Sequence, residues 1–230
     1  MKLGIMQPYF LPYIGYWQLM KTVDTYVIYD DVNYIKGGWI NRNQLLLNGK
    51  AFLFNLILNG ASPNKLINEI SVADNQEKLL KTIHSAYAKA PLFTTIFPLI
   101  EQMIRYENKN LGRYLGNSLV QIANYLQLDT KFIYSSDIKE KNNTLKAQDK
   151  VIHICTILGA TEYYNAIGGM DLYNKADFER NKIQLHFVKA NAIVYKQLKN
   201  VFVPNLSILD VLMFNSADEV NAMLDNYELI

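Results

Sequence analysis

The chain has 230 residues, of which 50% are hydrophobic and 19% are charged, which is typical of a globular domain rather than of a disordered segment. Its 23 Lys and Arg residues nearly balance its 21 Asp and Glu residues, which argues against a nucleic-acid-binding protein with a broad basic face. One cysteine excludes an intrachain disulfide, and without a signal peptide or an apolar run of ~18 residues we expect a cytoplasmic protein with no membrane span.

The first thirty residues predict a β-α-β unit. An apolar run from Lys2 to Gln7 is expected to form a buried strand, and Pro8 and Pro12 then bracket a loop. Apolar residues at helical spacing from Ile14 to Val23 predict a short helix, and Thr25 to Asp31 predicts a second buried strand. This unit indicates an α/β fold with a Rossmann-like, mostly parallel sheet flanked by helices.

Further elements follow in chain order, and we expect them to form one domain over residues 1–230. The domain would carry a helical insertion at about 75–128 and a C-terminal helical clasp at about 206–226. The expected strands are 51–58, 130–137, 161–169 (opening into a glycine turn) and 183–189. The expected helices are two or three within 75–127, punctuated by Pro91 and Pro98, and then 145–158, 176–182 and 206–224.

Ligands in open parallel sheets bind beyond the carboxyl ends of the strands. The polar and glycine residues that follow the predicted strands are Gln7, Tyr9, Asp30, Asp31, Ser135, Ser136, Asn165, Gly168 and Gly169. Adjacent Asp30 and Asp31 point to opposite faces, so one could serve as a base or cation ligand while the other caps a loop. Simple solubility at a strand end explains the pair equally well.

Two loops add candidate binding residues. The proline-stiffened segment QPYFLPYIGYW pre-positions Tyr9 and Tyr16, or its aromatic residues merely plug the edge of the sheet. The segment KGGWINRNQ gathers a compact set of groups that could grip an anion, hydrogen-bond an amide or stack on a ring. This set comprises Lys36, Trp39, Asn41, Arg42 and Asn43.

A third cluster, YYNAIGGMDLY, offers the Asn165 amide and the close-approach backbone of Gly168 and Gly169, or it is only a tight turn. The histidines have no partners at metal-ligand spacing, so we assign no metal site, and the sequence does not identify a cofactor. Neither GxGxxG nor a P-loop motif occurs.

Five segments together resemble the WbqC-like protein family: QPYFLPYIGYWQL, YDDVNYIKGGWINRNQ, AYAKAP, YYNAIGGMDLY and FVPNLSILDVLMFN. They occur in collinear order over essentially the whole chain. The resemblance implies a bacterial protein of surface-polysaccharide (O-antigen, lipopolysaccharide) biosynthesis, with a transferase activity on an activated sugar, for instance a nucleotide-sugar, or on a related small metabolite. It supplies no agreed catalytic residue.

As a transferase, the protein would orient its substrate with Gln7, Tyr9 and Asn165. Lys36 and Arg42 would hold an anionic group, and Asp30 would act as general base or cation ligand. One alternative is a nucleotide-dependent ligase or nucleotidyltransferase of the HUP type, although both histidines of the HxGH loop are missing where PYIGY stands. Another is a non-catalytic scaffold of polysaccharide assembly, which would expose apolar patches and lack an enclosed polar pocket.

The C-terminal segment FVPNLSILDVLMFN is predicted to fold back over the sheet domain, because ~18 residues cannot form a core alone. Asn205 or Ser207 would N-cap its helix. Asp210 in the first turn either complements the helix dipole or pairs with Arg42. We expect Ser207 and Asp210 to lie beside the QPYF loop or the loop around Arg42.

Overall fold

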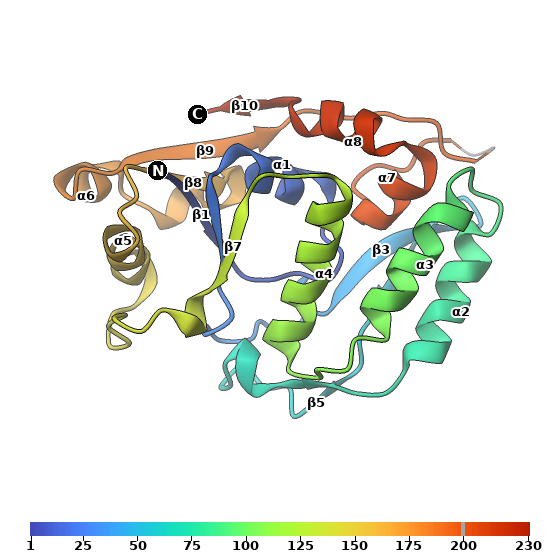
Figure 1. The fold of residues 1–230 in the computed structure, drawn as a ribbon, viewed down its shortest axis with the longest axis horizontal. Helices are drawn as coiled ribbons and strands as arrows, with labels where there is room; N and C mark the ends of the chain where they lie inside the picture. Colours follow the sequence, from blue (N-terminus) through green and yellow to red (C-terminus); the bar gives the residue numbers. More distant parts are fainter. Residues whose placement is uncertain (199–200) are drawn as a thin grey trace.

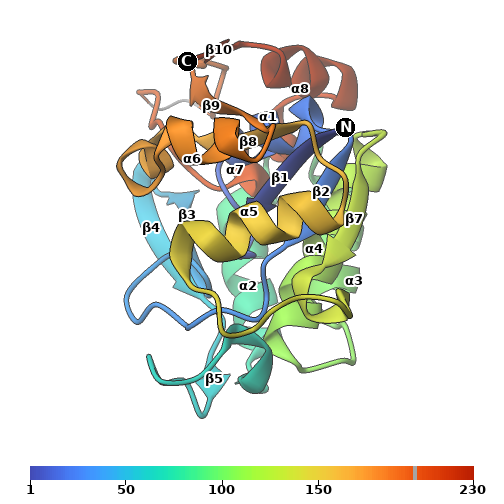
Figure 2. The same cartoon turned by 90° about the vertical axis from the view of Figure 1, so that its left-hand side faces the viewer.

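A central six-stranded sheet is covered by helices on both faces in the computed structural model, which describes residues 1–198 and 201–230 (Figures 1 and 2). The strand order is β10-β9-β8-β1-β2-β7. The strands are β1 (Lys2–Met6), β2 (Thr25–Ile28), β7 (Lys131–Tyr134), β8 (Glu162–Ala166), β9 (Gln184–Ala190) and β10 (Tyr227–Leu229). All neighbours pair in parallel except β9 and β10. The protein is therefore a mixed α/β protein with a mostly parallel central sheet, as predicted.

Side-chain alternation along the strands divides the core between the two faces of this sheet. Tyr26 and Ile28 of β2 join the larger cluster, which includes α1 (Ile14–Thr22), whereas Val27 joins the smaller one. The smaller cluster is closed by α5 (Ala147–Ile157) and α6 (Lys175–Arg180), which lie in front of the sheet in Figure 2.

Three helices occupy the stretch predicted to be helical: α2 (Gln76–Tyr87), α3 (Phe93–Ile104) and α4 (Leu111–Tyr125). Pro98 lies inside α3, so the expectation that it separates two helices is wrong. A proline in a helix leaves the carbonyl four residues earlier without a partner. Here that residue is Thr94, and both Thr94 and Pro98 are exposed, so water can satisfy the carbonyl.

The strand expected at 51–58 does not join the central sheet. It forms β4 (Lys50–Asn55), which pairs antiparallel with the unpredicted β3 (Arg42–Leu47) in a separate hairpin. The turn between them contains Asn48 and Gly49, both with positive φ, which is the chemistry of a tight hairpin. Two short strands, β5 (Leu58–Asn59) and β6 (Ser71–Val72), form another small pair.

The single C-terminal helix predicted over 206–224 is in fact two helices, α7 (Ile208–Phe214) and α8 (Ala217–Leu224). The break occurs because Ser216 and Glu219 form a capping box that starts a new helix. The predicted glycine turn at Gly168 and Gly169 is instead part of the 3-10 helix Ile167–Leu172. Every helix in the described part of the chain is too short or too polar to span a bilayer.

Candidate functional site

The carboxyl ends of β2 and β7 bring four of the predicted strand-end residues into direct contact, in two pairs. Ser136 donates to the Asp30 carboxylate from its backbone nitrogen (3.0 Å) and from its hydroxyl (2.7 Å). Ser135 donates to Asp31. These contacts arise because β2 and β7 are parallel and in register, so both loops leave the same edge of the sheet.

Asp30 is fully buried and lies against the start of α4, where a Cβ on Gly112 would be 2.9 Å from its own Cβ. Burial raises the pKa of Asp30, and the hydrogen bonds from Ser136 counteract that rise only in part. Asp30 therefore holds its proton at a higher pH than an exposed aspartate does. Ser136, which is exposed, separates it from solvent.

The Asp31 side chain points away from that of Asp30, as predicted for adjacent residues, and it contacts two lysines. The Lys141 ammonium contacts the Asp31 carboxylate and lies 3.1 Å from the Ser135 hydroxyl, and its side chain is only 3% exposed. Lys150 donates to the Asp31 backbone oxygen at 3.1 Å and lies over the Tyr29 ring. Burial alone would raise the pKa of Asp31, but the hydrogen bonds from Lys141 and Ser135 and both lysine charges hold it below its ordinary value.

A cleft of about 720 Å³ opens beside this ion pair, and we call it the lysine cleft. The described residues of its walls include Lys141, Lys146 and Lys150 but only one carboxylate, that of Asp31, so the positive charges among them exceed the negative by two. The start of α5 lies on the same wall, and Ala147 there has a φ of +46°. The unpaired N–H groups of a helix start favour anions, so charge and backbone both make this cleft suited to an anionic ligand.

The loop between β1 and α1 is fixed through its carbonyl groups. The buried Asn43 amide donates to the oxygens of Phe10 (3.1 Å) and Leu11 (2.8 Å), and the Tyr16 hydroxyl donates to that of Gln7 (2.7 Å). These bonds hold Leu11 at a φ of +46°, a left-handed conformation that is unfavourable for leucine. Asn43 and Tyr16, both predicted to bind substrate, are thus positioned to shape this loop.

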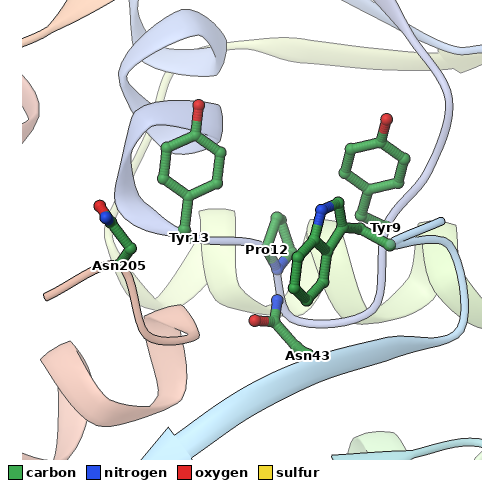
Figure 3. A pocket seen from close by; sticks show the side chains of 6 residues that line it. Tyr9, Pro12, Tyr13, Asn43 and Asn205 are labelled. Carbon is green, nitrogen blue, oxygen red and sulfur yellow. The ribbon is translucent and has the colours of Figure 1, made fainter. Parts of the chain in front are cut away.

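Tyr9, Pro12, Tyr13, Trp39, Asn43 and Asn205 line a second hollow of about 230 Å³, which we call the aromatic pocket. In Figure 3 the rings of Tyr9 and Tyr13 stand apart from each other with their hydroxyls pointing the same way. Gly15 makes room for Tyr13, because a Cβ at Gly15 would lie 2.5 Å from the ring. The pocket therefore joins residues from three of the sequence segments singled out above.

The remaining residues of the KGGWINRNQ segment differ in what they contact. Arg42 donates from Nε to the Gly38 oxygen (2.9 Å) and from Nη2 to the Gly37 oxygen, and it lies beside the Trp39 ring. Asn41 accepts from Tyr34 and donates to the Leu56 oxygen, both at 2.8 Å. Lys36 is exposed and lines neither the lysine cleft nor the aromatic pocket.

Asn165 lies at the carboxyl end of β8, where its amide donates to the Tyr163 hydroxyl at 3.1 Å and its oxygen accepts from the Ala166 nitrogen. Gly169 packs against it, with a would-be Cβ 3.0 Å from the Asn165 amide nitrogen. Gly168 is exposed and has open space around it. None of the three lines the two hollows described above.

The C-terminal helix α7 does lie beside the QPYF loop. The Ser207 hydroxyl donates to the Leu11 oxygen at 2.7 Å, and the Ser207 nitrogen donates to the Gln44 oxygen at 2.8 Å. Asp210 accepts from Tyr87 (2.8 Å), Tyr195 (2.6 Å) and Gln197 (2.8 Å) instead of pairing with Arg42, so that alternative is wrong. Burial raises the pKa of Asp210, and these three donors lower it only in part.

Replacing Ser207 with Ala is expected to lower the free energy of unfolding by about 2 kcal/mol, because it removes both the α7 N-cap and the bond to Leu11. Ser216→Ala removes only a cap at the exposed start of α8 and should cost about 1 kcal/mol. Urea denaturation of the two variants measures the difference. Equal losses would mean that the bond to Leu11 adds nothing.

Sequence reasoning missed Lys141, Lys146 and Lys150 as site residues. The sequence did contain a signal for these lysines, because the loop KEKNNT and the helix after it follow a strand that ends at the carboxyl edge of the sheet. It also missed Tyr87, Tyr195 and Gln197. Tyr87 lies in the segment AYAKAP, whereas Tyr195 and Gln197 lie outside the five segments named above, and only folding brings all three to Asp210.

Comparison with known proteins places these segments in a family. The uncharacterized protein Rv1507c of Mycobacterium tuberculosis is 26% identical over 223 residues, which is 95% of each chain. No solved structure matches the chain. The family model of the WbqC-like protein family matches residues 7–222, and the chain therefore belongs to the WbqC-like protein family.

Proposed function

We propose that the protein is a transferase that binds the phosphate-bearing end of an activated sugar, or of a related small metabolite, in the lysine cleft. The observation that carries this proposal is the excess of lysines over carboxylates around a cleft at the carboxyl edge of a parallel sheet. Such edges are where α/β proteins bind ligands, which also supports a Rossmann-like relationship of the sheet. The resemblance to the WbqC-like family supports a place in bacterial surface-polysaccharide biosynthesis.

Each lysine has a different part in this proposal. Asp31 fixes Lys141 and Lys150, so their charges are pre-oriented before a ligand arrives. Lys146 is exposed, and none of the described residues forms an ion pair with it, so it is available to a phosphate oxygen. An ammonium–phosphate contact is charge-assisted and strong.

Asp30 remains our proposed general base, acting through Ser136. The Ser136 hydroxyl lines the cleft and donates to Asp30 at 2.7 Å, so a proton removed from a substrate hydroxyl or amine could pass through Ser136 to the carboxylate. Arg42 serves in this proposal to position Trp39, because two of its N–H groups are occupied by its own loop.

Calorimetric titration with pyrophosphate and with a uridine diphosphate sugar tests the lysine cleft. We expect Lys146→Ala to weaken binding by about tenfold, because a hydrogen bond to a charged group contributes about 1.5–3 kcal/mol. Lys139→Ala is the matched control, since Lys139 is an exposed lysine of the same loop that does not line the cleft. An absence of binding by both probes, or equal loss in the two variants, would refute the proposal.

A further inference from the structure

The aromatic pocket is separate from the lysine cleft, and its chemistry is different. Among residues 1–198 and 201–230, none lines both hollows and none that lines the aromatic pocket is charged. Its surface is instead made of Tyr9, Tyr13 and Trp39 rings with Pro12 (Figure 3). Trp39 is 47% exposed and Tyr13 is 39% exposed, although both are large apolar groups on a framework that is held rigid.

The hydrogen-bonding groups of the pocket divide into used and unused ones. The Asn43 amide is fully engaged with Phe10, Leu11 and Gln44 of the framework. By contrast, the hydroxyls of Tyr9 and Tyr13 and the side chain of Asn205 make no hydrogen bond within residues 1–198 and 201–230. A ligand in the pocket would thus meet aromatic rings together with neutral hydrogen-bond donors and acceptors.

Two residues at the aromatic pocket have a backbone conformation with positive φ. Leu11, which precedes the lining residue Pro12, has a φ of +46°, and Asn205, which lines the pocket, has a φ of +58°. Leu11 is secured by Asn43 and Ser207, and the neighbouring Ile208 nitrogen donates to the Pro12 oxygen. Unfavourable backbone of this kind persists where the surrounding structure enforces it, and it concentrates at ligand sites.

We propose that the aromatic pocket binds one neutral sugar ring, with an apolar face of the ring against Trp39 and its hydroxyls directed to Tyr9, Tyr13 and Asn205. A volume of about 230 Å³ is below the ~300–1,000 Å³ of pockets for drug-sized ligands, so it suits a single ring and not a whole nucleotide. The described residues of its walls are all uncharged, which suits a neutral ligand. The role of this ring as the acceptor of the transfer rests on the proposed function, but its binding does not.

Ligand-observed NMR titration with methyl glucoside tests the pocket, with uridine as the planar-ring comparison. Trp39 supplies a site readout, because the only other tryptophan, Trp17, is fully buried and its fluorescence is not expected to respond. We expect saturable binding of methyl glucoside with a change in Trp39 fluorescence, and weaker binding of uridine. Trp39→Ala should weaken glucoside binding by about tenfold.

Phe52→Ala is the matched control, since Phe52 is a similarly exposed aromatic residue (44%) on β4, outside the pocket. It should leave glucoside affinity unchanged. No saturable glucoside binding, preferential binding of uridine, or an unaltered affinity in Trp39→Ala would overturn the inference. Pyrophosphate binding measured in Trp39→Ala separates the two proposals, because it should persist if only the sugar pocket is wrong and be absent in all variants if the lysine cleft is wrong.

Discussion

Replacing Asp31 with Asn is expected to lower the free energy of unfolding by about 3–5 kcal/mol, because it leaves the buried Lys141 ammonium without its counter-charge. Asp137→Asn is the matched control. Asp137 pairs with Arg113 only 2.5 Å away, but its side chain is 58% exposed, and an exposed pair contributes less than about 1 kcal/mol. Urea denaturation at neutral pH measures both losses.

The acid dependence of Asp31→Asn provides a second readout. The pKa of Asp31 in the folded protein is below its ordinary value of 3.8. The stabilisation that Asp31 contributes is therefore complete above pH 3.8 and is lost as the pH falls through the lower pKa of the folded state. The difference in the free energy of unfolding between wild type and Asp31→Asn should therefore disappear only in strong acid. Adding Lys141→Met to Asp31→Asn should restore part of the loss. Equal losses in the Asp31 and Asp137 variants, or no recovery in the double variant, would contradict this account.

Asp210→Asn is expected to cost about 3 kcal/mol, because a carboxamide cannot accept from three buried donors at once. The loss should include detachment of the segment around Tyr195 and Gln197 from α7. Asp218→Asn is the control, since Asp218 is an exposed carboxylate in the first turn of α8 and contributes about 0.3–1 kcal/mol through the helix dipole. Thermal and urea unfolding compare the two.

The pH dependence of this second variant has the opposite sign. The pKa of Asp210 is raised above 3.8 in the folded state. The stabilisation that Asp210 contributes is therefore complete below pH 3.8 and decreases as the pH rises through the folded-state pKa. The difference in the free energy of unfolding between wild type and Asp210→Asn should therefore decrease as the pH rises from 3.8. A difference that instead widens over this range would show that the three donors outweigh burial.

Local sequence alone was sufficient for most of the elements. The spacing of apolar residues, the placement of prolines and the β-branched runs predicted β1, α1 and β2, because these signals act over ten residues or fewer. The order of strand, helix and strand over the first thirty residues predicted the parallel pairing of the two strands. The same reasoning placed Asp30 and Asp31 on opposite sides of a strand end. It also gave Asn205 or Ser207 as the cap of a C-terminal helix beside the QPYF loop or the loop around Arg42. In the structure Ser207 caps α7 and bonds to the QPYF loop.

Only the tertiary structure decided which polar residues meet. Asp31 lies 110 positions from Lys141, and Asp210 lies 123 positions from Tyr87, so no local pattern connects either pair. Tertiary packing likewise determines that β3 and β4 form a separate hairpin, because the apolar pattern of a strand does not specify which strand it pairs with. Motif residues such as Asn43 stood out in the sequence, but their hydrogen bonds to the backbone of another loop are fixed only when distant segments pack together.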